Sequence, residues 1–82
     1  MNTIKIDGSF VDKIGKGGKN ESIVKNIIRL ADSLSAKTIA ECVETKEQVD
    51  FLLKNGCRLA QGYYYHKPLK PHEVLKLLKQ NQ

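Results

Sequence analysis

The sequence lacks the features that mark membrane-spanning and secreted proteins. No apolar run approaches the roughly 20 residues that cross a bilayer. The first ten residues, MNTIKIDGSF, have neither the basic start nor the long apolar stretch of a signal peptide. These absences favour a cytoplasmic protein with no membrane partner. With 82 residues, 40% of them hydrophobic and 28% charged, the chain is long enough for one small globular domain.

Cysteine is scarce and is poorly placed for a disulfide framework or a metal cluster. The chain has two cysteines, Cys42 and Cys57, and no C-x-x-C spacing. Closely spaced or numerous cysteines are what structural metal sites and disulfide-rich scaffolds use. We therefore expect two reduced and largely buried thiols.

Concentrated positive charge is also missing. The 14 Lys and Arg residues exceed the 9 Asp and Glu residues, which gives a net charge of +5. Such an excess favours anionic partners only in a general way. The lysines are spread along the chain and no run of five or six like charges occurs. The composition therefore does not indicate a nucleic-acid partner, whose binding would weaken steeply with salt.

What the sequence does contain is an alternation of strand-like and helix-like runs. Strand patterns around residues 3–6, 37–41 and 58–63 are each followed by a helical pattern. This order indicates βαβ units, with parallel strands joined by right-handed crossovers. The predicted fold class is therefore α/β, with three consecutive βα units.

Several local signals mark where the helices begin and end. Asn20 is the expected N-cap of the first helix. Thr45 and Gln48 match a T-x-x-Q capping box, and Gly56, after Asn55, predicts a left-handed stop. Pro71 suits the first turn of the last helix. The apolar positions expected on the buried faces are Ile23, Val24, Ile27, Ile28, Leu30, Ala31 and Leu34, then Val49, Leu52 and Leu53, then Val74, Leu75, Leu77 and Leu78.

Three βα units do not make a closed structure by themselves. Parallel sheets are normally covered on both faces, whereas consecutive units of a barrel place every helix on one side. One sheet face and both edges would remain open, and open edges invite pairing with another chain. The sequence therefore predicts a portion of a larger barrel, or a chain completed by association.

Charged and polar residues gather at the predicted carboxyl ends of the strands, where α/β folds place their functional groups. These residues are Lys5 and Asp7, then Glu41 and Glu44, then Gln61. Carboxylates and water suit the hard cations Mg²⁺ and Mn²⁺. A lysine can neutralise charge that develops on a phosphoryl oxygen. The pattern is compatible with a hydrated metal and a phosphate at one rim.

Three motifs at these positions carry a resemblance to a known family. IKIDGSFV, TIAECVET and GCRLAQGYYYHKPL, in this order, resemble the C-terminal part of the EAL family of cyclic di-GMP phosphodiesterases. The resemblance extends from about Thr3 to His72, so the chain is interpreted as one partial EAL domain over residues 1–82. It implies part of a TIM-like barrel and a bacterial signalling role. The intact family hydrolyses cyclic di-GMP to a linear dinucleotide with Mg²⁺ or Mn²⁺.

The resemblance assigns a role to each rim residue. Lys5 matches the lysine of the K-I-D motif in the catalytic centre, and Asp7 matches its acid. Glu41 matches the first acid of A-E-G-V-E, to which catalytic or loop-stabilising roles are given. Glu44 matches the second acid and Gln61 the glutamine of the Q-G motif. The resemblance thus implies that Lys5 and Glu41 are catalytic, and that Asp7, Glu44 and Gln61 lie in the shell of metal-bound waters or at the substrate rim.

Two departures from the family pattern limit these implications. Cys42 stands where glycine is usual, which adds bulk beside Glu41. The E-A-L glutamate, the asparagine and glutamate of the next metal-binding strands, and the D-D-F-G pair have no counterpart here. These residues supply most of the direct metal ligands, so no complete ligand set exists in this chain. We expect no tightly bound Mg²⁺ or Mn²⁺ and no phosphodiesterase activity of the chain alone.

The expected partners follow from this incomplete barrel. They are cyclic di-GMP, at the level of the family, and either a second copy of the chain or a complementing N-terminal barrel fragment. Two alternatives to the phosphodiesterase fragment remain open. One is an oligomerisation or interaction module, and the other is a cyclic di-GMP effector remnant without catalysis.

Overall fold

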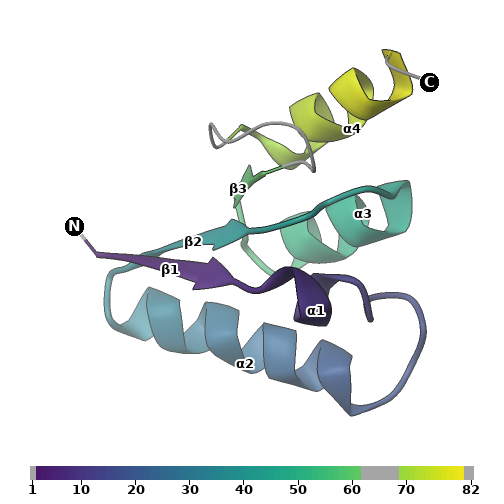
Figure 1. The fold of residues 1–82 in the computed structure, drawn as a ribbon. Helices are drawn as coiled ribbons and strands as arrows, with labels where there is room; N and C mark the ends of the chain where they lie inside the picture. The colour runs from purple at the N-terminus through teal and green to yellow at the C-terminus, as the bar shows by residue number, and fades with distance from the viewer. Residues whose placement is uncertain (1, 62–68, 81–82) are drawn as a thin grey trace.

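The computed structural model describes residues 2–61 and 69–80 and shows an α/β architecture. Its elements in chain order are β1 (Thr3–Ile6), α1 (Gly8–Val11), α2 (Lys19–Ser33), β2 (Lys37–Ala40), α3 (Lys46–Lys54), β3 (Leu59–Ala60) and α4 (Pro71–Gln80). The strands form one sheet in the order β1-β2-β3, and both neighbouring pairs are parallel (Figure 1). The predicted class of three parallel strands in βα units is confirmed.

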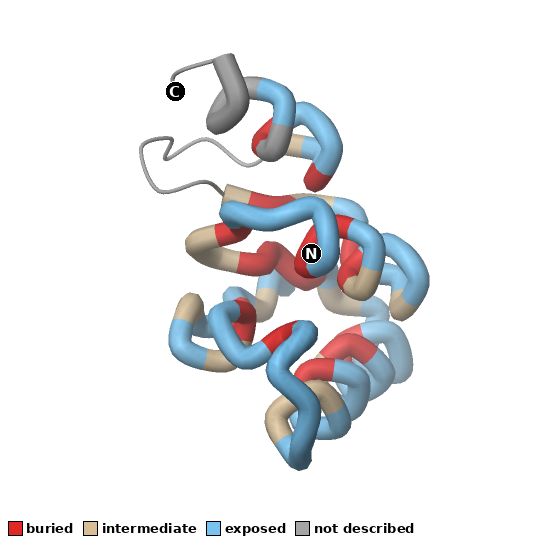
Figure 2. Tube along the Cα trace, turned by 90° about the vertical axis from the view of Figure 1, so that its right-hand side faces the viewer, coloured by how far each residue is buried: buried red, intermediate tan, exposed pale blue. Residues whose placement is uncertain are grey.

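One face of the sheet forms the core with the helices. Ile6, Ala40 and Ala60 share a register across the three strands, and each is almost fully buried. They belong to one apolar cluster with residues of the three longer helices, namely Val24, Ile28, Val49, Leu52 and Val74. Figure 2 shows the buried positions concentrated where the elements face one another. The helices therefore cover the same face, as consecutive units of a barrel do.

The opposite face of the sheet carries the other set of alternating residues. Lys5, Ile39 and Leu59 are in register, so their side chains leave the face opposite to the helices. Lys5 is exposed, Leu59 is half-buried and Ile39 is buried, although Ile39 is not part of the main cluster.

The capping signals of α3 are confirmed and that of α2 is wrong. Thr45 and Gln48 form the complete capping box, and Gly56 has a φ of 96° directly after the Asn55 C-cap. By contrast, α2 begins one residue before Asn20, with Gly18 as its N-cap at a φ of 88°. Gly18 adopts this left-handed conformation without a Cβ penalty, so the chain enters the helix without an asparagine cap.

The buried face of α2 is narrower than predicted. Val24, Ile28 and Ala31 are buried, whereas Leu30 and Leu34 are 57% and 63% exposed. Ile23 is 39% exposed, and on α3 Leu53 is 37% exposed rather than buried. The predicted stripe was too wide because periodicity marks every apolar position, whereas the sheet contacts only one row of each helix.

β1 has its predicted bounds, β2 is one residue shorter than predicted, and among the described residues no strand lies beside the outer edge of β1. β2 ends at Ala40 and β3 spans two residues, while Tyr63 lies outside the described residues. Leu69 forms an antiparallel bridge to Ala60, with N–H···O distances of 2.7 and 2.8 Å. The predicted open edge on the β3 side is therefore wrong at Ala60.

The last helix begins at Pro71, as predicted. Pro71 and Val74 are buried against the rest of the structure. The side chains of Leu75, Leu77 and Leu78, which were expected to be buried, lie outside the described part. In the segments that the structure describes, none of the helices combines the length and apolar character needed to cross a bilayer.

Candidate functional site

The backbone brings the three strand ends together at one rim. Ile6, Ala40 and Ala60 are paired across the sheet, so the next residues, Asp7, Glu41 and Gln61, follow at the same level. The amide of Glu41 donates to the carbonyl of Ile6 at 3.0 Å, and the amide of Gln61 donates to the carbonyl of Ala40 at 2.8 Å. Neighbouring parallel strands lie about 5 Å apart. The rim residues chosen from the sequence therefore come from adjacent strand ends.

Lys5 lies one layer below this rim, on the face opposite to the helices. Its register partner Ile39 precedes Glu41 by two residues, so Lys5 shares a face with the rim residues. Lys5 is exposed, and in the described part of the chain its ammonium forms no ion pair. The structure thus presents one cation beneath the half-buried Glu41 and Gln61.

Asp7 has a structural task as well as a place at the rim. It is the N-cap of α1, and its carboxylate accepts hydrogen bonds from the hydroxyl and the amide of Ser9. The Ser9 hydroxyl first, and then the Ser9 amide, hold the pKa of the Asp7 carboxyl below its ordinary value. Asp7 therefore stays ionised, with one carboxylate oxygen already engaged within its own loop.

The loop that carries Glu44 is fixed from below by Gln48. The Gln48 side chain is buried, and its Oε1 accepts from the amide of Glu44 at 2.7 Å and from the amide of Thr45 at 3.1 Å. The bond to Thr45 completes the capping box, whereas the bond to Glu44 extends it by one residue. The T-x-x-Q motif predicted the role of Gln48 in the cap. The bond from the Glu44 amide was not predicted, although the same motif marks the glutamine that accepts it.

Cys42 lies at the centre of the acidic rim in a left-handed conformation. Its φ of 58° lies in the region that favours glycine, the residue usual at this position in the family. Partial burial first, and then the carboxylates of Glu41, Glu44 and Asp7, raise the pKa of the Cys42 thiol. Cys42 is therefore a neutral thiol at neutral pH, and the three acids lie close enough to act on it.

The prediction of two largely buried thiols is met by one of them. Cys57 is fully buried and Cys42 is half-buried, and both are free. The reason is that Cys57 follows α3 inside the core, whereas Cys42 leaves the sheet at the rim. The raised pKa of Cys42 disfavours the thiolate that metal binding and nucleophilic chemistry require.

The chemistry of the rim is anionic, with oxygen donors that suit a hard cation. Even so, in residues 2–61 and 69–80 no group of three or more His, Cys, Asp or Glu could hold a metal ion. The residues at hand therefore do not by themselves form the site of the Mg²⁺ or Mn²⁺ that the resemblance implies.

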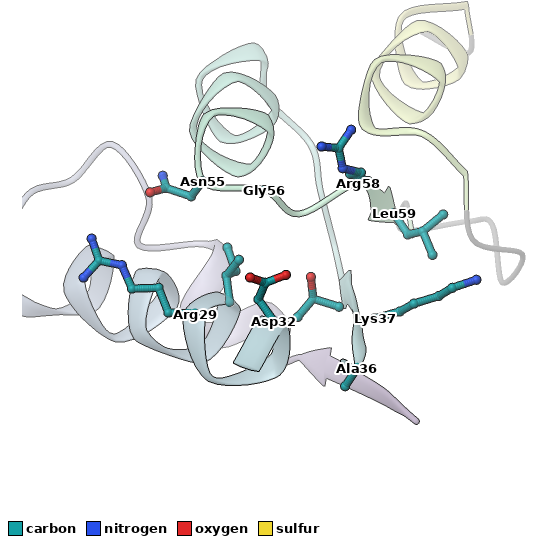
Figure 3. A pocket seen from close by; sticks show the side chains of 10 residues that line it. Arg29, Asp32, Ala36, Lys37, Asn55, Gly56, Arg58 and Leu59 are labelled. Atoms are coloured by element: carbon teal, nitrogen blue, oxygen red, sulfur yellow. The ribbon is translucent and has the colours of Figure 1, made fainter. Parts of the chain in front are cut away.

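A cavity of about 540 Å³ lies at the other end of the sheet (Figure 3). It is lined by residues from the C-terminal ends of α2 and α3 and from the starts of β2 and β3, including Arg29, Asp32, Lys37, Asn55 and Arg58. The strands begin here, whereas the rim lies where they end. This cavity is therefore separate from the candidate site.

Comparison with known proteins places the chain among the EAL domains. The family model described as "EAL domain" matches residues 1–68. The probable cyclic di-GMP phosphodiesterase PdeG of Escherichia coli is 40% identical over 75 residues. The cyclic di-GMP phosphodiesterase NbdA of Pseudomonas aeruginosa is 39% identical over 69 residues. The chain belongs to the EAL domain family.

Solved structures agree with this assignment and show its extent. The EAL enzyme Bd1971, in a form with cAMP and cyclic di-GMP bound, aligns with a TM-score of 0.74 and 38% identity. The EAL domain of Mycobacterium smegmatis DcpA aligns with a TM-score of 0.72 and 36% identity. The alignments cover 95% and 100% of this chain but 21% and 37% of those chains. Similarly, the matches to PdeG and NbdA cover 92% and 84% of this chain but only 15% and 9% of those relatives.

Proposed function

We propose that this chain supplies the C-terminal part of an EAL-type cyclic di-GMP phosphodiesterase site and that it is inactive by itself. The observation that carries the proposal is the rim, where Asp7, Glu41 and Gln61 follow directly after three paired strand positions. Its residues coincide with the three motifs that resemble the family. The names of PdeG, NbdA and Bd1971 connect such domains with cyclic di-GMP.

Each rim residue has a distinct part in this proposal. Lys5 neutralises negative charge that develops on a phosphoryl oxygen of cyclic di-GMP during hydrolysis to the linear dinucleotide. Glu41, which is half-buried beside Gln61, is the proposed second catalytic residue. Asp7, Glu44 and Gln61 orient water or substrate at the rim. In a complete barrel that holds Mg²⁺ or Mn²⁺, the metal would supply an activated water.

The metal ligands of the complete site are proposed to come from the remainder of an EAL barrel. The rim offers oxygen donors but no group of three ligands in the described residues. A complementing N-terminal barrel portion is therefore the proposed partner, with a second copy of the chain as the alternative. The cytoplasm is the proposed location.

Turnover of cyclic di-GMP by the purified chain tests the proposal. The chain is incubated with Mg²⁺ or with Mn²⁺, and the products are separated by chromatography. We expect no linear dinucleotide from the chain alone. We expect product after addition of the N-terminal portion of an EAL domain, and its loss in Lys5→Ala but not in Lys37→Ala, an exposed lysine at the opposite end of the sheet. Robust turnover by the chain alone, lost in Lys5→Ala, would contradict inactivity.

An effector remnant is the second candidate function. The same rim would then bind cyclic di-GMP and perform no hydrolysis. The three carboxylates near Cys42 do not favour such binding in the absence of a metal cation, because they repel the negatively charged phosphates. Calorimetric titration of the chain with cyclic di-GMP in the presence of EDTA separates the two. Binding without metal, and no turnover with the complementing portion, would favour the effector.

A further inference from the structure

The cavity at the beginning of the strands is formed within two consecutive βα units. Its described lining residues lie between Ile28 and Leu59, on α2, on β2, at the end of α3 and at the start of β3 (Figure 3). They come from neither β1 nor α4. Sites for small molecules usually measure about 300–1,000 Å³. With about 540 Å³, the cavity has the volume of such a site and is built from this chain's own residues.

Thr38 brings a polar side chain to the buried side of this cavity. Because side chains alternate along β2, Thr38 lies on the same face of the sheet as Ala40, which is the face that the helices cover. Thr38 is only 7% exposed, and it lines the cavity.

The Thr38 hydroxyl makes no hydrogen bond to the described protein. The Cys57 thiol donates to the main-chain carbonyl of Thr38 at 3.8 Å and not to its hydroxyl. In the described residues, every polar side-chain atom that is closed off from solvent has a partner, so this hydroxyl is open to the cavity. Nearly buried hydroxyls are usually hydrogen-bonded. An unpaired one at the base of a cavity points to a ligand that supplies the partner.

The mouth of the cavity carries more positive than negative charge. Arg29, Lys37 and Arg58 are exposed cations, and Asp32 is the one acid among the described lining residues. Lys37 precedes Thr38 and therefore leaves the other face of the sheet, and Figure 3 shows its side chain extending away from Asp32. Neither arginine forms an ion pair within the described residues. Both guanidinium groups are thus available to an anion, and their paired N–H donors suit phosphate oxygens.

The two helix ends at the cavity do not favour a metal cation. Both α2 and α3 end in a left-handed residue, Ser35 with a φ of 56° and Gly56 with a φ of 96°. The backbone amides that follow donate to the carbonyls of Ala31 and Leu52 at 2.8 and 2.9 Å, so these terminal carbonyls are already engaged. Asp32 would then be the one carboxylate ligand, whereas divalent cations need several oxygen ligands.

The remaining lining suits an organic molecule better than a bare ion. Ile28 is buried and Ala36 is half-buried, so this part of the surface is apolar. The Asp32 carboxylate is an acceptor for donors such as sugar hydroxyls. A nucleoside monophosphate combines a phosphate, hydroxyl donors and an apolar base surface in a molecule of suitable size.

We propose that this cavity binds a small organic phosphate of the size of a nucleoside monophosphate. Arg29 and Arg58 bind the phosphate, and the Thr38 hydroxyl donates to it from the buried side. Asp32 accepts from a hydroxyl of the ligand, while Ile28 contacts its apolar part. The site is independent of the proposed function, because the rim lies at the other end of the sheet and takes no part in it.

Binding of adenosine 5′-monophosphate to the 82-residue chain tests the proposal. Calorimetric titration measures its affinity, and adenosine and inorganic phosphate serve as comparison ligands. We expect saturable one-to-one binding of the monophosphate, and affinities at least about tenfold lower for both comparison ligands. Arg29→Gln and Arg58→Gln should each weaken binding about tenfold, since each removes a charge-assisted hydrogen bond. Thr38→Val should weaken it about fivefold through the loss of one neutral hydrogen bond.

Two controls separate binding from folding and from general charge. Because the Thr38 hydroxyl has no protein partner, Thr38→Val should keep the urea midpoint of unfolding at or above the wild-type value while it weakens binding. Lys19→Gln removes one positive charge at the start of α2, about 15 Å along the helix from Arg29, and should leave binding unchanged. Circular dichroism checks that the arginine variants are folded.

Several outcomes would overturn the inference. They are the absence of saturable binding, equal binding by the Arg58→Gln or Thr38→Val variant, and an equal loss of affinity in Lys19→Gln. Inorganic phosphate that binds as tightly as the nucleotide would refute an organic ligand. A loss of binding in Lys5→Ala, with Arg58→Gln unaffected, would place the nucleotide at the rim. None of these results depends on turnover of cyclic di-GMP, so the proposed function is tested separately.

Discussion

The side chain of Cys42 fills the space that a side chain at Gly8 would need. A β-carbon placed on Gly8 would lie 2.7 Å from the Sγ and 3.0 Å from the Cβ of Cys42, closer than carbon and sulfur normally approach. The Cys42 side chain thus packs directly over the start of α1. This contact joins the loop after Asp7 to the loop after Glu41, so it holds two of the three rim segments together. A larger residue at one of the two positions requires a smaller residue at the other.

Gly8→Ala should destabilise the protein by about 1–3 kcal/mol, the usual cost of overpacking. The added methyl group has no space while Cys42 is present. The measurement is the free energy of unfolding from urea titration, with the slope checked for constancy.

The control for this prediction is the same substitution in a Cys42→Gly background. There the clash is absent, and alanine is preferred over glycine within a helix by about 0.5–1 kcal/mol. Gly8→Ala should then be neutral or stabilising. An equal loss of stability in both backgrounds would show that the two positions are independent.

The Cys42 thiol should react slowly with iodoacetamide at pH 8. Its pKa is raised, by partial burial first and then by Glu41, Glu44 and Asp7, so the thiolate fraction is small. Glu41→Gln and Glu44→Gln should each lower this pKa and accelerate alkylation. Glu73→Gln, on α4, should have no effect. Mass spectrometry identifies the modified cysteine, and unchanged rates in both rim variants would refute the electrostatic contribution.

The same shift has a consequence for stability. Since the folded-state pKa is above the ordinary value of 9.0, the folded protein favours the protonated thiol. This stabilisation is fully present below the unfolded-state pKa and is lost as the pH rises through the folded-state pKa. The free energy of unfolding should therefore decline more steeply above pH 9 in the wild-type chain than in Cys42→Gly.

Ser9→Ala should raise the pKa of the Asp7 carboxyl toward its ordinary value of 3.8. The variant removes the hydroxyl bond, which is the larger cause of the lowered pKa, and leaves the amide bond in place. Because the folded-state pKa is lowered, the stabilisation is present above the unfolded-state value and is lost as the pH falls through the folded one. NMR titration of the Asp7 carboxyl measures the shift.

A matched control for this titration is Ser33→Ala. The Ser33 hydroxyl donates to the carbonyl of Leu30 at 2.7 Å, far from Asp7 in the chain. Its removal should leave the Asp7 titration unchanged. If both serine variants moved the Asp7 pKa equally, the local hydrogen bond would not be the cause.

Gln48→Ala should free the Glu44 loop and lower stability by about 1–2 kcal/mol, through the lost cap and the unpaired amides. Amide hydrogen exchange at Glu44 and Thr45 should accelerate, because both amides donate to the Gln48 side chain. Gln48→Glu keeps an acceptor oxygen and should retain much of the protection. Thr45→Ala, which removes the hydroxyl that accepts from the Gln48 amide, should leave Glu44 protected.

Most of the candidate rim was predictable from the sequence because its signals are local. The change from a strand to a helical pattern gives the strand ends, and parallel pairing then places Asp7, Glu41 and Gln61 side by side. The capping box at Thr45 and the stop at Gly56 depend on a few consecutive residues. The burial of Ile6, Ala40 and Ala60 follows from the alternation of a strand.

Features that depend on what lies beside an element were not predictable. Periodicity alone cannot separate the row of α2 that meets the sheet from Leu30 and Leu34, which point to its open side. The left-handed conformation of Cys42 was also hidden, because non-glycine residues seldom adopt it. Its only signal was the glycine that the family usually has there. Asn20 is not the N-cap because Gly18 takes that position, and the conformation of Gly18 is known only from the structure.

The hydrogen bonds between Ala60 and Leu69 limit how the sheet can grow. A sheet with two unpaired edges can add further copies at both edges without limit, and such repeated addition forms fibres. This sheet has one margin occupied by its own polypeptide. Strand addition is therefore open at the β1 edge and blocked at Ala60, which works against the repeated head-to-tail addition that builds a fibre.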